Sequence, residues 1–139
     1  MKAYFDTSVL LRKVLGEPRA LRQWSSIKMA LSSELIVVEA QRTIDRARVR
    51  LRLGDDEVAN RRSDVLQALG ALHLAKLNRA VLDRAAEPFP TVLGTLDAIH
   101  LATAILLRET NADLVFATHD AELAVAARSV GFVVIGAAK

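Results

Sequence analysis

Short apolar runs alternate along the chain with longer stretches in which apolar residues recur every three or four positions. The short runs predict a weak strand at 31–34 and clearer strands over residues 2–5, 72–77, 113–118 and 132–135. The helical spacing is clearest over 35–52, where one apolar stripe is formed by Ile36, Ala40, Ile44, Ala47 and Leu51. Gly54 ends this pattern, and Asp55 and Asp56 can begin the next helix.

Further helices are predicted by the same spacing over residues 9–15, 19–31, 95–109 and 120–130. Strands that alternate with helices are typical of a mostly parallel sheet with helices on both faces. The sequence has 139 residues, enough for one hydrophobic core and too few for two. We therefore predict an α/β fold, with three layers (α/β/α) around a mostly parallel central sheet, in a single domain over residues 1–139.

The composition is that of a globular chain, because 52% of the residues are hydrophobic. No apolar run approaches the roughly 20 residues that a membrane span needs, so we expect no membrane segment. The sequence contains no cysteine, which excludes disulfides and thiolate metal sites. The expected location is the cytoplasm.

Basic residues slightly outnumber acidic ones, with 19 Lys and Arg against 16 Asp and Glu, a net charge of +3. This balance is compatible with a nucleic-acid partner without indicating one. Many of the arginines gather in one stretch, namely Arg42, Arg46, Arg48, Arg50, Arg52, Arg61 and Arg62. Two interpretations stay open: a solvated helical surface with paired charges, or a surface that contacts phosphates.

Four acids lie at or near the boundaries of predicted elements. Asp6 directly follows the first strand, and Asp120 follows the strand at 113–118. Because sites in open parallel sheets form beyond the carboxyl ends of the strands, both acids should reach one edge of the sheet. Asp97 opens a helix that is apolar nearly all round, and Glu39 lies in the first turns of the helix 35–52, beside its apolar stripe.

Each of these acids alone has a simpler explanation. Asp97 and Asp120 could cap their helices, and Glu39 could be a half-buried surface acid. Four carboxylates gathered at one end of a sheet would however repel one another unless a cation neutralised them. With no cysteine and only three histidines, an all-oxygen site suits Mg²⁺ or Mn²⁺ better than zinc.

The segments that contain these acids resemble the four acidic motifs of PIN-domain ribonucleases, particularly the VapC toxins of toxin–antitoxin pairs. The matching segments are FDTSVLL, LIVVEAQRTI, TLDAIHLATAI and FATHDAELAVAARSVGF. They occur in the family's order and cover nearly the whole chain, although residues 53–94 carry no motif. The resemblance implies a PIN-like fold and identifies the metal-binding, catalytic acids as Asp6, Glu39, Asp97 and Asp120.

The resemblance also implies supporting residues and an activity. Ser8 and Thr118 would support the acids by hydrogen bonds, and Arg42 could contact an RNA phosphate or pair with an acid. Carboxylate-bound Mg²⁺ or Mn²⁺ would activate a water that hydrolyses the RNA backbone, leaving a 5′-phosphate and a 3′-hydroxyl.

Proteins of this family usually form homodimers and are inhibited by a small cognate antitoxin that covers the acidic pocket, so we expect both partners here. The expected groove or dimer face lies on the helices at 19–31 and 35–52, which carry Leu21, Trp24, Ile27, Ile36 and Ile44.

Three residues near these acids in the sequence are not expected to bind the metal. Glu34 is a rival to Glu39, but the family's acid lies inside the helix and is followed by a basic residue, which fits Glu39. His100 is expected to be a hydrogen-bonded core residue, and His119 to point away from its neighbours Thr118 and Asp120.

Two alternative functions are weighed against the ribonuclease. A phosphatase of the haloacid dehalogenase type also begins with a strand and an aspartate, but it requires a second aspartate where this chain has Ser8. A non-catalytic PIN-like module would bind RNA or a protein without cutting, and the four acids argue against that loss of activity.

Overall fold

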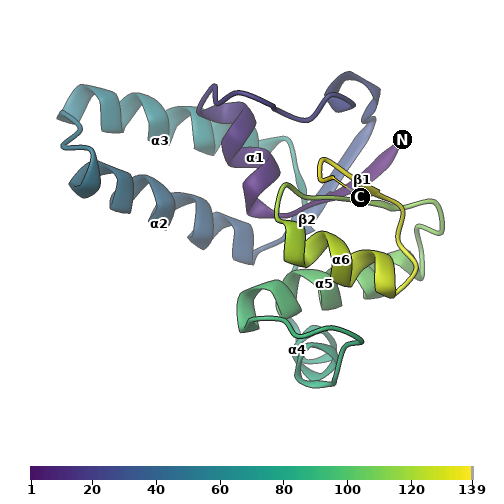
Figure 1. The fold of residues 1–139 in the computed structure, drawn as a ribbon. Coiled ribbons are helices and arrows are strands. Elements are labelled where there is room, and N and C mark those ends of the chain that lie inside the picture. The colour runs from purple at the N-terminus through teal and green to yellow at the C-terminus, as the bar shows by residue number, and fades with distance from the viewer. Residues whose placement is uncertain (139) are drawn as a thin grey trace.

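The computed structural model describes residues 1–138, and its centre is a sheet in which every pair of neighbouring strands is parallel (Figure 1). The strand order is β3-β2-β1-β4-β5. In chain order the strands are β1 (Lys2–Phe5), β2 (Met29–Ser33), β3 (His73–Ala75), β4 (Val115–Ala117) and β5 (Val134–Ile135).

Helices cover both faces of this sheet (Figure 1). One face carries α1 (Thr7–Val14), α2 (Leu35–Arg50) and α3 (Asp55–Gly70). The other face carries α5 (Thr95–Arg108) and α6 (Ala121–Ser129), with α4 (Arg79–Ala86) packed against α5. The predicted α/β fold with three layers and a parallel sheet is therefore confirmed.

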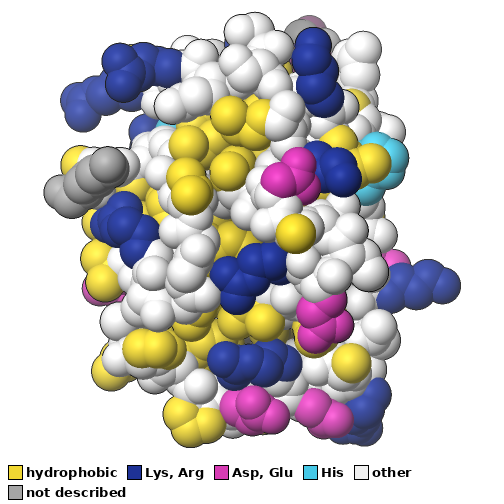
Figure 2. Space-filling view, turned by 90° about the vertical axis from the view of Figure 1, so that its right-hand side faces the viewer, with side chains coloured by type: hydrophobic (Ala, Val, Ile, Leu, Met, Phe, Trp, Pro, Cys, Tyr) yellow, Lys and Arg dark blue, Asp and Glu magenta, His cyan; other side chains and the backbone are white. Residues whose placement is uncertain are grey.

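Figure 2 shows the side of the molecule on which the amino terminus lies in Figure 1. Hydrophobic side chains on this side form several groups, with Lys and Arg side chains between them. None of the helices in residues 1–138 is both long and apolar enough to cross a bilayer.

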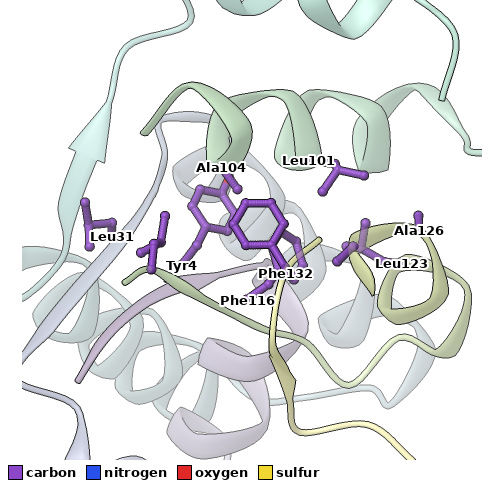
Figure 3. Packing of buried hydrophobic residues seen from close by; sticks show 10 residues of the cluster. Tyr4, Leu31, Leu101, Ala104, Phe116, Leu123, Ala126 and Phe132 are labelled. Atoms are coloured by element: carbon purple, nitrogen blue, oxygen red, sulfur yellow. The ribbon is translucent and has the colours of Figure 1, made fainter. Parts of the chain in front are cut away.

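The core consists of layers on the two sides of β1. Tyr4 points to one side and packs with Phe116 and Leu31 from the neighbouring strands against α5 and α6 (Figure 3). Ala3 and Phe5 point to the other side, toward α1 and the segment that precedes β2. This alternation is the period of two that a pleated strand imposes, and it makes β1 buried on both faces.

The helix expected over residues 19–31 is wrong. This segment forms turns and a single 3₁₀ turn, Trp24–Ser26, before β2 begins at Met29. Leu21, Trp24 and Ile27 recur every third residue, but they pack as a loop against Phe5 and its neighbours. Residues 29–33 form a strand and not the end of a helix, because Met29 pairs in parallel with Lys2 and this pairing satisfies backbone groups at the centre of the sheet.

The apolar residues expected on a groove or dimer face are mostly inside the molecule, which corrects that expectation. Leu21 is 4% exposed, and Ile36 and Ile44 are fully buried. Trp24 and Ile27 are partly buried against the same cluster as Leu21. Leu21, Ile36 and Ile44 therefore hold the 19–28 segment and α2 in place and offer no surface to a partner, whereas Trp24 and Ile27 remain partly exposed.

The carboxyl ends of β1 and β4 lie side by side. Phe5 is in register with Ala117, and the backbone N–H of Asp6 donates to the carbonyl of Ala117 at 3.3 Å. The backbone N–H of Thr118 continues the ladder to Ile135 of β5 at 3.1 Å. As a result, the residues that follow β1 and β4 emerge together at one edge.

Candidate active site

Asp6 is the most buried acid of this edge, with 5% of its surface exposed. It caps α1, because its Oδ1 accepts hydrogen bonds from the backbone N–H of Val9 at 3.3 Å and from the hydroxyl of Ser8 at 2.6 Å. Its Oδ2 accepts a hydrogen bond from the hydroxyl of Thr118 at 2.6 Å. Both hydroxyl residues named from the sequence therefore lie directly against Asp6.

The same two hydroxyls also accept hydrogen bonds, which ties Asp6 to the start of α6. Ser8 Oγ accepts from the backbone N–H of His119 at 3.0 Å, and Thr118 Oγ1 accepts from that of Asp120 at 3.0 Å. Asp120 caps α6, and its Oδ1 accepts from a backbone N–H of the first turn at 2.9 Å. Asp6 and Asp120 are thus linked through Thr118 across the ends of two adjacent strands.

Glu39 is held by side chains from two other elements, α1 and α5. Its Oε1 accepts a hydrogen bond from Thr7 Oγ1 at 2.7 Å and contacts Nε2 of His100 at 2.5 Å. The other ring nitrogen of His100, Nδ1, lies 2.7 Å from the hydroxyl of Tyr4. Since an ionised carboxylate only accepts, His100 donates to Glu39 from Nε2, and Nδ1 and the Tyr4 hydroxyl share a hydrogen bond. A chain of hydrogen bonds therefore runs from the core to Glu39.

His100 is the buried, hydrogen-bonded residue that the sequence predicted, and it is 1% exposed. Sequence analysis missed its contact with Glu39, and it also missed Thr7 and Tyr4. The spacing of three residues between Asp97 and His100 places both on one side of α5 and was the available signal. The partner of that side could not be inferred, because it comes from α2.

Asp97 lies in the first turn of α5, and its carboxyl interacts electrostatically with the other three acids. Burial and the negative charges of Asp120, Asp6 and Glu39 raise the pKa of its carboxyl to about 6. Within the described part of the chain its carboxylate oxygens accept no hydrogen bond. The structure thus brings the four candidate acids into electrostatic range of one another.

The pKa values of the other two shifted acids move in opposite directions. Burial raises the pKa of Asp6 even though Ser8 and Thr118 stabilise the charged form. Burial also acts to raise the pKa of Glu39, but the hydrogen bond and charge of His100 and the bond from Thr7 outweigh it, so the net shift is downward. Ionisation is therefore favoured at Glu39 and disfavoured at Asp6 and Asp97.

Arg42 and Glu34 lie outside this network. Arg42 Nη1 pairs with Asp45 at 3.0 Å on the exposed surface of α2, although Arg42 lines the same cavity as Glu39. Glu34 precedes α2, and its Oε2 accepts from the backbone N–H of Leu77 at 3.2 Å. Glu34 therefore fastens the end of β3 and takes no part in the cluster.

Part of the arginine-rich stretch is a paired helical surface. Arg42 and Arg48 both pair with Asp45, and Arg61 pairs with Glu57. The interpretation with paired charges thus holds for these three arginines.

The oxygen donors of the site fit a hydrated hard cation. Within residues 1–138 no three acid or imidazole groups approach closely enough to ligate one ion together. Glu39 Oε2, Asp120 Oδ2 and both oxygens of Asp97 accept no hydrogen bond from those residues, and Asp6 Oδ2 accepts only one. Mg²⁺ commonly uses one or two carboxylates and keeps several waters, so these oxygens suffice.

Comparison with protein families decides the relationship of this chain. The profile of the PIN domain matches residues 3–129. The chain belongs to the PIN-domain family. The match includes all four candidate acids of this PIN domain and both hydroxyls that hold Asp6.

Two relatives from Mycobacterium tuberculosis resemble this PIN domain over almost their full length. Ribonuclease VapC47 of strain CDC 1551 / Oshkosh is 33% identical over 133 residues, which cover 94% of this chain and 93% of that protein. Ribonuclease VapC46 of strain ATCC 25618 / H37Rv is 33% identical over 135 residues, covering 95% of each.

A solved structure shares the fold. The crystal structure of PAE2754 from Pyrobaculum aerophilum has a TM-score of 0.58 with 18% identity, covering 96% of this chain and 83% of that one. The phosphatase of the haloacid dehalogenase type has no such support, and Ser8 hydrogen-bonds Asp6 instead of supplying a second acid.

We expect the stability of the metal-free PIN domain to rise as the pH falls from 7 toward 4, because Asp97 binds its proton more tightly when folded. Its folded pKa is about 6 against 3.8 unfolded, so this stabilisation is complete below 3.8 and lost above 6. Asp97→Asn should therefore raise the melting temperature at pH 7.5 in EDTA by about 3 °C, or about 1 kcal/mol after solvent screening. Thermal melts at several pH values test this, and a variant no more stable than the parent at pH 7.5 would contradict it.

We expect His100→Ala to lower the free energy of unfolding by about 2–4 kcal/mol, because it leaves the Tyr4 hydroxyl and Glu39 without their partner. Tyr4→Phe, which removes only the hydroxyl at the far end of the chain, should cost about 1–2 kcal/mol. Urea unfolding followed by circular dichroism measures both. If both variants lowered the free energy of unfolding by the same amount, below about 1 kcal/mol, this series of hydrogen bonds would not stabilise the fold.

Proposed function

We propose that the protein is a metal-dependent endoribonuclease of the VapC type, acting as one domain over residues 1–139. The observation that carries the proposal is the convergence of four acids at the carboxyl edge of a PIN-family sheet, with the pKa of Asp97 raised to about 6. A carboxyl that is hard to ionise among other carboxylates is typical of a site that functions with a bound cation. Two relatives named as ribonucleases support RNA as the substrate.

In this proposal oxygens of Asp6, Glu39, Asp97 and Asp120 would hold Mg²⁺ or Mn²⁺, some of them through bound waters. The chemistry that such an ion would supply is polarisation of the phosphodiester and a lower pKa for the attacking water. Asp97 and Asp120 offer oxygens that the fold leaves free, so they are the acids best able to bind the ion directly. Asp6, with three hydrogen bonds, fixes the centre of the site.

The surrounding side chains would position the acids. Thr7 and His100 fix one oxygen of Glu39 and leave Oε2 for the ion or a bound water. Ser8 and Thr118 hold Asp6 against the start of α6. Such outer partners set the direction of metal ligands and restrict their motion.

We further propose that a small cognate antitoxin inhibits the nuclease in the cytoplasm by covering Glu39. A cavity of about 400 Å³ adjoins this acid, and α1, α2 and the start of α5 form its walls. Val38 and Leu96 line it and are 59% and 50% exposed, so an apolar segment could bury them. A basic side chain of the antitoxin could pair with the acids at the end of this groove.

A homodimer is the second proposed partner. Three of the five residues expected on the dimer face are buried, but other apolar side chains of α2, of the turn that follows it and of α3 are exposed. These are Val49, Leu51 and Leu66. Their exposure favours this surface as the dimer contact.

We expect nuclease activity on single-stranded RNA to vanish in EDTA and to return with Mg²⁺ or Mn²⁺. Changing a residue that only supports a metal ligand typically lowers metal affinity or activity 10–100-fold. Asp97→Asn and Glu39→Gln change the proposed ligands themselves, so each should lower the cleavage rate by at least ~100-fold. Glu34→Gln is the matched control, because Glu34 lies five residues before Glu39 but accepts a hydrogen bond from the residue 77 backbone after β3, and this variant should retain activity within about twofold.

Cleavage of a labelled RNA by purified variants measures these rates. Full activity in EDTA, or equal losses for Glu34→Gln and Glu39→Gln, would contradict the proposed site. Wild-type protein that binds RNA in Mg²⁺ and never cuts it would instead indicate the non-catalytic PIN-like module.

We expect light scattering to give the mass of a dimer for the purified protein at micromolar concentration, and a larger complex with the product of the adjacent gene. Val38→Asp should weaken that complex at least tenfold by placing a charge in an apolar contact, while Val49→Asp should affect only the dimer. A monomer that ignores the neighbouring gene product would remove both partners from the proposal.

A further inference from the structure

A second cavity lies beyond the acid cluster, at the carboxyl end of β5. Its volume is about 530 Å³, within the range of ligand sites in proteins. The loop after α1 contributes Arg19, Leu21 and Arg22, and the end of the sheet contributes His119 and Gly136. None of these residues is among the candidate acids or their hydrogen-bonding partners, except that His119 directly precedes Asp120.

The imidazole of His119 is fixed in one orientation with one nitrogen unused. Its Nδ1 lies 2.8 Å from the carbonyl oxygen of Gly136, and a carbonyl only accepts, so Nδ1 carries the proton. Nε2 of the neutral ring is therefore an acceptor. It is buried without a hydrogen-bond partner among residues 1–138, which a protein tolerates poorly unless a ligand or water supplies one.

Gly136 makes this orientation possible. Its φ is +95°, a conformation that side chains disfavour. A Cβ at this position would also lie 2.7 Å from the carbonyl oxygen of Thr118 and 3.3 Å from Nδ1 of His119. The backbone therefore approaches the ring closely only because residue 136 has no side chain.

The charge and polarity of the cavity fit a nucleotide. Arg19 and Arg22 are exposed, and neither forms an ion pair with any residue of the described part of the chain. The floor is apolar, with Leu21 and Val134. Guanidinium groups bind phosphates, and an apolar floor accepts a base. Nε2 of His119 is buried, so a base N–H would donate to it once the atoms that cover it move aside.

The cavity adjoins the acid cluster through the backbone. The N–H of His119 donates to Ser8 Oγ, and Ser8 donates to Asp6. When the scissile phosphate of an RNA strand lies at Asp6 and Asp120, a neighbouring nucleotide of the same strand would lie at this cavity. Two unpaired arginines favour a polyanion over the basic segment of an inhibitor, which would be attracted to the acids.

We propose that this cavity binds one nucleotide of the RNA strand beside the scissile phosphate. Arg19 and Arg22 contact its phosphates, and His119 Nε2 accepts a hydrogen bond from its base. The inference rests on the proposed ribonuclease function and adds a subsite that selects the base at one position next to the cut.

Fluorescence anisotropy with a labelled single-stranded RNA tests the subsite without cleavage. Binding is measured at several salt concentrations in EDTA, and again with Mg²⁺ in an Asp97→Asn background. For single strands the slope of log K against log salt changes by about 0.7 for each phosphate contact, so Arg19→Ala with Arg22→Ala should reduce it by about 1.4. Arg62→Ala, an exposed arginine of α3 outside every described ion pair, is the matched control and should leave the slope unchanged.

His119→Asn can keep an N–H near the position of Nδ1 for the Gly136 carbonyl, and it removes Nε2. It should weaken binding of RNAs whose bases present an N–H at this position by about 3–10-fold, and should reduce differences among homopolymers. Circular dichroism confirms that each variant is folded before binding is compared.

The outcomes separate this subsite from the activity itself. If the parent protein binds and cuts RNA while all cavity variants behave as Arg62→Ala does, the subsite is overturned and the ribonuclease stands. If the cavity variants no longer bind the product of the adjacent gene, the expected antitoxin, but bind RNA as the parent does, the cavity is a protein-binding site and the proposal is wrong. If the parent neither binds nor cuts any RNA, both the subsite and the proposed function are overturned.

Discussion

The burial of one carboxylate, that of Asp6, sets the arrangement of the whole edge. A desolvated carboxylate is tolerated only when its oxygens are satisfied, and Asp6 obtains three hydrogen bonds from α1 and Thr118. These bonds require the ends of β1 and β4 to be adjacent, which the parallel register of Phe5 and Ala117 provides. The same groups fix where α1 and α6 begin, so the site and the fold share one set of constraints.

This arrangement separates two tasks among the acids. Asp6 is fully engaged and forms the fixed point, whereas Asp97 is free of hydrogen bonds in the described part of the chain and carries the cost of repulsion. Glu39 is intermediate, since one oxygen is held by Thr7 and His100 and the other is free. The mutual repulsion in this cluster disfavours ionisation of Asp97.

Much of the fold was predictable because its strongest signals are local. The run before Asp6 and the spacing within residues 35–52 each report burial directly, and the element ends placed the acids at one edge. β2 was predicted only weakly because it contains two serines. Ser32 donates to the carbonyl of Phe5 at 2.7 Å, and Ser33 accepts from the N–H of Leu35 at 3.0 Å, so these buried hydroxyls look polar in sequence while serving the backbone.

Other features depend on contacts between distant elements and leave no local trace. The spacing of Leu21, Trp24 and Ile27 fits a helix as well as the loop that the sheet requires. The contact between His100 and Glu39 joins α5 to α2, which are 61 residues apart in the chain at this point. Periodicity could place each residue on a surface of its helix, but only the packing of both helices on the sheet determines that they meet.

The hydrogen bonds that link Tyr4 through His100 to Glu39 affect which substitutions this sequence can accept during evolution. Tyr4 stacks on Phe116, with ring centroids 5.3 Å apart, inside the apolar layer beneath α5 and α6. A substitution that shifts this layer moves the tyrosine hydroxyl, and with it the imidazole and the carboxylate. In the layer on the opposite side, around Ile44 and Val65, no side chain hydrogen-bonds an acid within the described part of the chain. Neutral variation should accumulate faster in the second layer than in the first.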